Sequence, residues 1–321
     1  MKKINYFSLN RISKKIVLID GIPRTGKLLL ASLVSSFDKM EHLEFGENFE
    51  HFIPAVKFNK IPTDFAKSFL NNYLNQLIYN KYISRNVNFR PHDRTGINQS
   101  RNPKLYKKRL RTMEGDHVIK SIKKQNHILP LVTHDMSVNL DALYKLKMNF
   151  KIIEILRSPV EIVYSWYKRG LGLRFGSDPR IFTLLMKRSS KVYPWYEAAE
   201  RKSYGNLSPC EVCIKYVINL TNLSIENLKK KSLNKNIFLT SYDQITQNTL
   251  SELKKISKFL GTKTNKKTLE FIKKENCPIL FNKDNYLKKL ETIEKLSSNS
   301  FFSMLLELQK KYDQNYYNLK R

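Results

Sequence analysis

Residues 17–34, VLIDGIPRTGKLLLASLV, constrain the fold of this chain more than any other segment. The segment begins as a buried apolar strand, passes through a glycine-containing turn and continues as an apolar helix. Gly21, Gly26 and Lys27 fit the pattern G-x-x-x-x-G-K, which is typical of phosphate-binding loops. Backbone N–H groups at the start of a helix bind anions, so the segment predicts a phosphate site where a strand ends.

Short apolar runs elsewhere in the chain are typical of buried strands in a parallel sheet. Together with the first strand they cover residues 15–20, 42–45, 128–133, 151–156 and 236–241. Helical patterns alternate with them, and the segment 250–261 ends on a glycine suited to a helix C-cap. This alternation predicts an α/β fold with three α/β/α layers, a central parallel sheet and a resemblance to P-loop NTPases. Ligands of such folds bind at the carboxyl ends of the strands.

We expect a single domain, because no Gly/Ser-rich or Pro-rich linker divides the chain. The domain is expected to span residues 1–321, with a core at about 15–261. Two insertions are expected at 57–127 and 170–235, and a helical C-terminal segment at 262–321. Apolar residues repeat at helical spacing between Phe301 and Tyr316. We interpret this repeat as a helix packed on the sheet, with an amphipathic membrane anchor as the alternative.

The balance of charge predicts an anionic partner. Lys and Arg number 58 against 28 Asp and Glu, a formal net charge of +30. A polyphosphate cofactor, an acidic glycan, nucleic acid or a membrane surface would each fit, and so would lysines that only cover a solvated surface. No apolar run reaches the roughly 18 residues of a membrane span, and the first residues lack a secretory signal. With only three cysteines, these features predict a cytoplasmic location.

Leu28 separates this loop from those of nucleotide triphosphatases. In those enzymes a hydroxyl at the same position holds Mg²⁺, which neutralises the transferred phosphoryl group. A leucine side chain cannot ligate magnesium. The sequence therefore favours the transfer of a less charged group without a metal, and sulfuryl transfer fits that description.

A second anion site is predicted at the end of the strand 151–156. Arg157 follows this strand, Ser158 is a natural helix N-cap, and the proline after it suits a first helical position. Ser165 lies seven residues after Ser158, almost two helical turns, and therefore faces the same side. Arg157 and the Ser165 hydroxyl can converge on one anionic group.

Three segments resemble, in the same order, the motifs of sulfotransferases that use 3′-phosphoadenosine 5′-phosphosulfate (PAPS). Residues 22–30, IPRTGKLLL, are similar to the 5′-phosphosulfate loop of that family. Residues 157–165, RSPVEIVYS, are similar to its 3′-phosphate motif, and residues 242–261 to a segment near the end of its core. The resemblance frames most of residues 15–261 and implies PAPS as the sulfuryl donor, with no metal. A nucleotide with 5′ and 3′ phosphates also requires two anion sites at neighbouring strands.

The resemblance assigns roles within the first loop. Gly21 begins the turn, and Pro23 and Arg24 match the family's proline and basic residue. Arg24 would neutralise the phosphosulfate bridge during transfer. Thr25 and Gly26 match positions that bind the 5′-phosphate.

The resemblance also covers the second site and shows where this chain departs from the family. Arg157 and Ser165 match the 3′-phosphate ligands, and Tyr242 matches a tyrosine near the adenine. Lys27 and Leu28 belong to the cofactor loop but replace its usual hydroxyl residues. The next residue, a leucine, replaces an adenine-stacking tryptophan, and the late basic Lys-Gly loop of the cytosolic branch is missing.

The acceptor must lose a proton as it attacks sulfur, so a general base is expected within reach. His134 follows a predicted strand, and an unperturbed histidine titrates near neutrality, which suits a base. The alternative interpretation is that His134 and Asp135 only cap the next helix. The other candidates are carboxylates of the segment EFGENFEHF, Glu47 first and Glu50 second, since glucosaminoglycan sulfotransferases resemble this arrangement.

The acceptor itself is expected to be a hydroxyl, or an amine, of a carbohydrate, a lipid or a small molecule. An anionic glycan is one such partner, and the basic run 85–111, with Arg94 or Arg101, could bind it. Peripheral membrane contact fits the charge as well, whereas nucleic acid is not favoured. Two other functions remain open: a P-loop kinase that uses Lys27 and Asp135, and a polyanion-binding protein without enzymatic activity.

Overall fold

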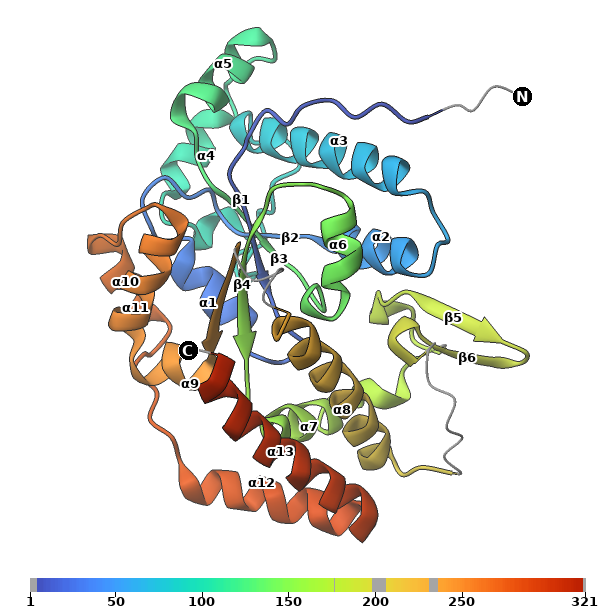
Figure 1. Cartoon of the computed structure of the whole chain (residues 1–321). Coiled ribbons are helices and arrows are strands. Elements are labelled where there is room, and N and C mark those ends of the chain that lie inside the picture. Colours follow the sequence, from blue (N-terminus) through green and yellow to red (C-terminus); the bar gives the residue numbers. More distant parts are fainter. Residues whose placement is uncertain (1–4, 176, 198–205, 231–235, 320–321) are drawn as a thin grey trace.

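The computed structural model describes residues 5–175, 177–197, 206–230 and 236–319, without the side chains of 315–319. Its centre is a parallel five-stranded sheet with the order β2-β3-β1-β4-β7 (Figure 1). These strands are β1 (Ile16–Asp20), β2 (Glu44–Phe45), β3 (Leu129–Val132), β4 (Lys151–Leu156) and β7 (Ile237–Ser241). A separate antiparallel hairpin is formed by β5 (Leu185–Arg188) and β6 (Lys191–Pro194). The five predicted strands and their parallel arrangement are confirmed.

Helices occupy both faces of the sheet (Figure 1). The first six are α1 (Lys27–Val34), α2 (Glu47–Lys57), α3 (Thr63–Tyr82), α4 (Pro103–Arg109), α5 (Asp116–Gln125) and α6 (Leu140–Lys145). They are followed by α7 (Pro159–Tyr167), α8 (Pro209–Leu228), α9 (Tyr242–Gln247), α10 (Thr249–Leu260), α11 (Lys266–Lys274), α12 (Lys283–Leu296) and α13 (Asn299–Leu319).

Alternation along the strands assigns the helices to the two faces, because neighbouring strand residues point in opposite directions. Val17 and Ile153 pack in a core with residues of α1, α10 and α11. Leu18 and Ile152 pack in a second core with residues of α2, α3, α5 and α6. The predicted three-layer α/β/α fold is therefore confirmed.

The insertion 57–127 is attached to the sheet edge through one buried carboxylate. Glu41 accepts hydrogen bonds from Arg109 at 2.8 Å, from Tyr106 at 2.7 Å and from His127 at 2.7 Å. Burial alone would raise the pKa of Glu41, but the hydrogen bonds from Arg109 and His127 lower it well below its usual value. The carboxylate thus stays ionised and fixes α4 beside the strand that follows Glu41.

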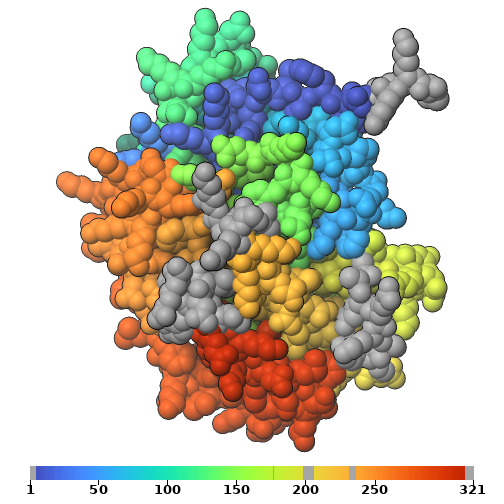
Figure 2. Space-filling view, in the orientation of Figure 1, coloured from blue at the N-terminus to red at the C-terminus, as the bar shows by residue number. Residues whose placement is uncertain are grey.

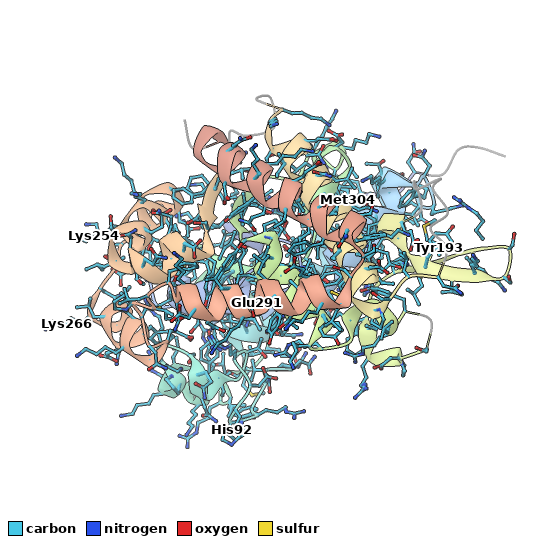
Figure 3. The ribbon with its side chains drawn as sticks, turned by 90° about the horizontal axis from the view of Figure 1, so that it is seen from below. His92, Tyr193, Lys254, Lys266, Glu291 and Met304 are labelled. Carbon is cyan, nitrogen blue, oxygen red and sulfur yellow. The ribbon has the colours of Figure 1, made fainter. Side chains whose placement is uncertain are left out.

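The C-terminal helix is present and packs on other helices as well as on the sheet core. Phe301, Leu305 and Leu308 of α13 are buried in a third core with residues of α7 and α8, whereas Tyr312, further along the helix, is buried in the core that contains Leu18 and Ile152. Figures 2 and 3 show α12 and α13 together at one end of the molecule. The side chain of Tyr316 lies outside the described residues. Within the described part of the chain, every helix is too short or too polar to cross a membrane.

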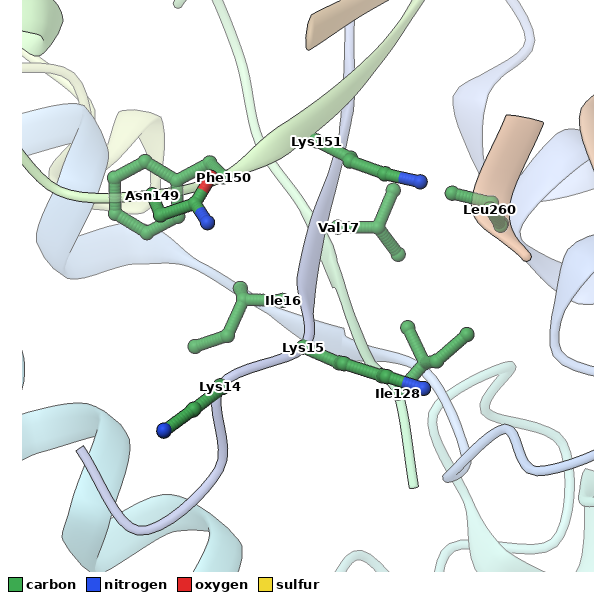
Figure 4. Close-up of a pocket in the computed structure, with 9 residues that line it drawn as sticks. All are labelled: Lys14, Lys15, Ile16, Val17, Ile128, Asn149, Phe150, Lys151 and Leu260. Atoms are coloured by element: carbon green, nitrogen blue, oxygen red, sulfur yellow. The ribbon is translucent and has the colours of Figure 1, made fainter. Parts of the chain in front are cut away.

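A cavity of about 150 Å³ opens at the amino ends of β1 and β4 (Figure 4). Lys14, Lys15 and Lys151 contribute to its lining. The ammonium groups of Lys14 and Lys151 point in different directions, and that of Lys151 donates to the carbonyl of Phe259. These lysines therefore do not converge on one anion, and the cavity lies at the sheet edge opposite to the glycine-containing loop.

Candidate active site

The loop between β1 and α1 requires glycine at both of its ends. Gly21 has φ +149°, and a Cβ there would lie 2.6 Å from the carbonyl oxygen of Ile155. Gly26 has φ +99°, and a Cβ there would lie 2.6 Å from the ring of Tyr242. Side chains other than hydrogen are excluded at these distances, so the two glycines allow the loop to approach β4 and α9 closely.

The loop also presents the start of α1 without a competing carboxylate. Gly26 is the N-cap of the helix, provides no side-chain cap, and no acidic residue lies in the first turn. The positive end of the helix dipole is therefore available to an anion. The hydroxyl of Thr25 donates to the carbonyl of Ile22 at 3.0 Å, which fixes the shape of the loop.

Helix α7 and Arg157, which precedes it, hold the loop through three hydrogen bonds. The Trp166 indole donates to the carbonyl of Pro23 at 3.0 Å. Nε of Arg24 donates to Oγ of Ser165 at 3.0 Å, and Nη1 of Arg157 donates to the carbonyl of Arg24 at 3.1 Å. The structure thus brings together Arg24, Arg157 and Ser165, at the carboxyl ends of the neighbouring strands β1 and β4.

This convergence leaves positive charges close to one another. Burial lowers the pKa of Arg24, and repulsion from Arg169 and Arg157 lowers it further. Arg24 also has φ +75°, a left-handed conformation that costs about 1–2 kcal/mol for a residue with a Cβ. Backbone strain of this kind is frequent at functional sites, and a bound anion stabilises clustered guanidinium groups, so this position has the chemistry of an anion site.

The surroundings of Arg157 include an aromatic ring and an open cleft. Its guanidinium lies 4.1 Å from the centre of the Tyr242 ring and 2.9 Å from Glu161, which also binds Lys289 at 2.9 Å. The cleft has a volume of about 450 Å³ and is lined by Arg157, Tyr242, Lys289 and the exposed Phe281, among others. The segment around Phe281 thus stands beside the predicted second anion site.

Lys27 lies beneath the loop, not on its surface. The side chain is 4% exposed, and its ammonium donates to the carbonyls of Gly21 at 2.5 Å and Ile22 at 2.9 Å. Burial lowers the pKa of Lys27, while Asp20 and Asp135 oppose that shift. The expectation that this ammonium contacts phosphate, on which the kinase alternative depends, does not fit the structure.

Asp135, the other residue of the kinase alternative, is also buried. Burial raises the pKa of Asp135 well above its usual value, although Lys27 acts in the opposite direction.

His134 lies after β3 and contacts α2. Its Nδ1 is 2.8 Å from Oε1 of Glu50, and the two side chains are 34% and 21% exposed. Glu47 begins the same helix, and burial, followed by repulsion from Glu50 and Glu44, raises its pKa. The sequence offered the histidine and the carboxylates as alternatives, whereas the structure joins His134 to Glu50.

Other residues singled out in the sequence have structural contacts. Arg94 pairs with Glu275 at 2.8 Å, and Arg101 donates to the carbonyl of Phe37 behind α1. Trp195 and Tyr196 are buried in the core formed with α7 and α8.

Sequence reasoning missed two contacts at this site. Glu161 binds Arg157 from one helical turn away, and the i,i+4 spacing was the signal for that pair. Trp166 binds the loop across a long sequence separation, for which the sequence holds no local signal.

A sequence model described as "Sulfotransferase domain" matches residues 14–312. No curated protein matches the chain significantly. Among solved structures, the sulfotransferase domain of the Synechococcus PCC 7002 olefin synthase is 11% identical, with a TM-score of 0.47 and coverage of 97% of this chain and 98% of that one. Mycobacterium avium sulfotransferase STF9 is 11% identical, with a TM-score of 0.45 and coverage of 95% and 78%. Mouse sulfotransferase SULT7A1 complexed with PAP is 13% identical, with a TM-score of 0.39 and coverage of 98% and 89%.

Proposed function

Because the chain belongs to the sulfotransferase domain family, we propose that it transfers a sulfuryl group from PAPS to a hydroxyl, or an amine, of an acceptor. The observation that carries the choice of donor is the contact of Arg24 with both Ser165 and Arg157. These residues connect two predicted anion sites, as a nucleotide with 5′ and 3′ phosphates requires.

The residues present fit such a nucleotide. Nε of Arg157 is buried without a hydrogen-bond partner among the described residues. In our proposal the loop and the start of α1 hold the 5′ side, and Arg157 and Ser165 hold the 3′-phosphate. Tyr242 and the cleft beside it would take the adenosine. PAPS supplies the sulfuryl group when bound.

His134 is the proposed general base, and Glu47 is the alternative. His134 is partly exposed at the carboxyl end of the sheet, so an acceptor can reach its ring. His134→Ala should reduce turnover by about 10²–10⁴-fold and leave binding of 3′-phosphoadenosine 5′-phosphate (PAP) nearly intact. Normal turnover in His134→Ala, with a loss in Glu47→Gln, would transfer the role to Glu47.

The acceptor is proposed to be a carbohydrate, lipid or small molecule, with an anionic glycan favoured by the charges near α2. The hairpin β5–β6 extends from the molecule and exposes Lys187, Arg188 and Lys191 (Figure 3). Its preceding segment joins α2 where the ring of His51 contacts the carbonyl of Phe182 at 3.0 Å. Transfer to a carboxylated oligosaccharide should exceed transfer to its neutral analogue and should fall as salt is added. Equal transfer to both would remove the anionic acceptor from the proposal.

A thermal-shift titration with PAP, ATP and ADP tests the donor. At about 100 times its dissociation constant, a ligand of the native state adds about 2.7 kcal/mol of stability. We expect a concentration-dependent rise in melting temperature with PAP and little change with ATP or ADP. A response to ATP alone, with activity that excess EDTA abolishes, would favour the kinase. Salt-sensitive binding of polyanions without a response to PAP would favour a non-enzymatic binding protein.

A further inference from the structure

His134 contacts Glu50 through one specific ring nitrogen. The contact joins Nδ1 to Oε1 at 2.8 Å, an ordinary hydrogen-bond distance. An ionised carboxylate can only accept hydrogen bonds, so Nδ1 must carry the hydrogen and donate it. In the neutral imidazole, the lone pair then belongs to Nε2, the nitrogen that is able to take a proton.

Glu50 is held in place by its helix. It lies near the start of α2, where the helix dipole favours a negative side chain. Its neighbours Phe49 and Ile53 are fully buried in the core against the sheet, so the helix cannot rotate without breaking that packing. Glu50 also lies close enough to Lys27 to favour the charged form of that ammonium, which places the pair beside the phosphate loop.

A second histidine–carboxylate pair shows what a structural role looks like in this chain. Nδ1 of His127 is 2.7 Å from Oε1 of Glu41, but that carboxylate also binds Arg109 and Tyr106. His127 is less exposed than His134, with 19% against 34% of the side chain accessible. The pair at His134 is open on the histidine side, which a purely structural contact does not need.

We propose that Glu50 is the positioning residue for the general base: it fixes the orientation and tautomer of His134 so that Nε2 faces the acceptor. This inference rests on the proposed sulfotransferase function. In the proton-transfer step the acceptor O–H bond breaks and an N–H bond forms at Nε2. The resulting imidazolium, protonated on both nitrogens, is stabilised by the carboxylate at Nδ1 and then returns the proton to solvent.

Two substitutions separate the orientation of the ring from the charge that stabilises it. Glu50→Gln keeps an oxygen that can accept from Nδ1–H but removes the negative charge. Glu50→Leu removes both. We expect kcat to fall by about 10-fold in Glu50→Gln and by about 100-fold in Glu50→Leu, the range seen when groups that orient a functional histidine are removed. The KM for PAPS and the affinity for PAP should stay within about twofold of the wild type, because Glu50 is not assigned a cofactor contact.

A matched control is Glu270→Gln, since Glu270 is an exposed carboxylate that pairs with Lys267 at 2.7 Å. It should change neither kcat nor the affinity for PAP. Unchanged kcat in Glu50→Leu, or a loss of PAP affinity equal to the loss of kcat, would overturn the positioning role.

Nitrogen-15 NMR of the histidine rings gives a readout that does not require activity. The chain has six histidines, and the His134 signals are identified by their loss in His134→Gln. When the His134 ring of the wild type is neutral, we expect a protonated Nδ1 and an unprotonated Nε2. In Glu50→Leu we expect a shift toward the opposite tautomer. The same tautomer in both proteins would refute the inference. If the wild type shows neither sulfuryl transfer nor PAP binding, the proposed function fails, while the tautomer still decides whether Glu50 orients the ring.

Discussion

Replacement of Arg157 by Gln is expected to weaken both PAP binding and the fold. The guanidinium donates to the carbonyl of Arg24 at 3.1 Å, pairs with Glu161 at 2.9 Å and lies 4.1 Å from the ring centre of Tyr242. Its Nε has no hydrogen-bond partner among the described residues and remains available to an anion. Arg157→Gln removes all of these interactions at once.

The two effects can be measured separately. A hydrogen bond to a charged group contributes about 1.5–3 kcal/mol, so the dissociation constant for PAP should rise by about 10–150-fold. For the fold, the ion pair with Glu161 contributes about 0.2–1 kcal/mol, the cation–π contact about 0.5–1 kcal/mol and the hydrogen bond to the Arg24 carbonyl up to about 3 kcal/mol. We therefore expect Arg157→Gln to lower the melting temperature as well as the affinity for PAP.

Isothermal titration calorimetry with PAP at a fixed ionic strength measures the first effect, and thermal denaturation measures the second. Arg85→Gln is the matched control, because Arg85 pairs with Glu114 in the insertion 57–127 and both side chains are about half exposed. Both variants lose one positive charge. Equal weakening of PAP binding in the two would mean that net charge, and not a site at Arg157, attracts the nucleotide.

Three further predictions concern the loop and the insertion. Gly26→Ala should abolish PAP binding and lower the melting temperature, because its Cβ would lie 2.6 Å from the Tyr242 ring. A double variant, Gly26→Ala/Tyr242→Ala, that melts no higher than Gly26→Ala would contradict this steric clash. Lys27→Thr, which returns a hydroxyl to the loop, should lower the free energy of unfolding in urea by about 3 kcal/mol, since it leaves buried carboxyl groups without their cation. An unchanged urea midpoint of unfolding would contradict this. Despite burial, hydrogen bonds from Arg109 and its neighbours lower the pKa of Glu41, so its contribution to stability is present above about pH 4.3 and is lost as the pH falls below that value. The difference in melting temperature between wild type and Glu41→Gln should therefore shrink on acidification, and a constant difference would refute the assignment.

The sheet and the helix after β4 were predictable because their signals are local. Ser158 caps α7 and Pro159 is its first residue, as the sequence indicated. Gly261 ends α10 in a left-handed conformation, again as predicted. Short apolar runs in the strands and capping residues at the helix ends each depend on a few neighbouring residues, which is why they can be read without the rest of the fold.

The direction of the Lys27 side chain could not be predicted in this way. Its ammonium is drawn beneath the loop by Asp20, Asp135 and Glu154, which come from three separate strands or strand ends. The packing of α13 against α7 and α8 has the same origin, because an apolar stripe specifies burial but not the partner. The roles assigned to Arg157, Ser165 and His134 remain predictions that the experiments above decide.

The loop separates two layers of charge, and this separation distinguishes it from the phosphate-binding loop of a nucleotide triphosphatase. Beneath it, Asp20 and Glu154 face each other across β1 and β4, and burial, together with Asp20, raises the pKa of Glu154. Lys27 is the cation of this lower layer, so its ammonium interacts with groups inside the protein and not with a ligand above the loop. Above the loop, Arg24 and Arg157 provide the charge, and guanidinium groups bind anions as planar forks without a metal. This loop has Leu28 in place of a magnesium-binding hydroxyl, and it also lacks an ammonium that would contact a terminal phosphoryl group. Its remaining donors therefore suit an anion that is bound without magnesium.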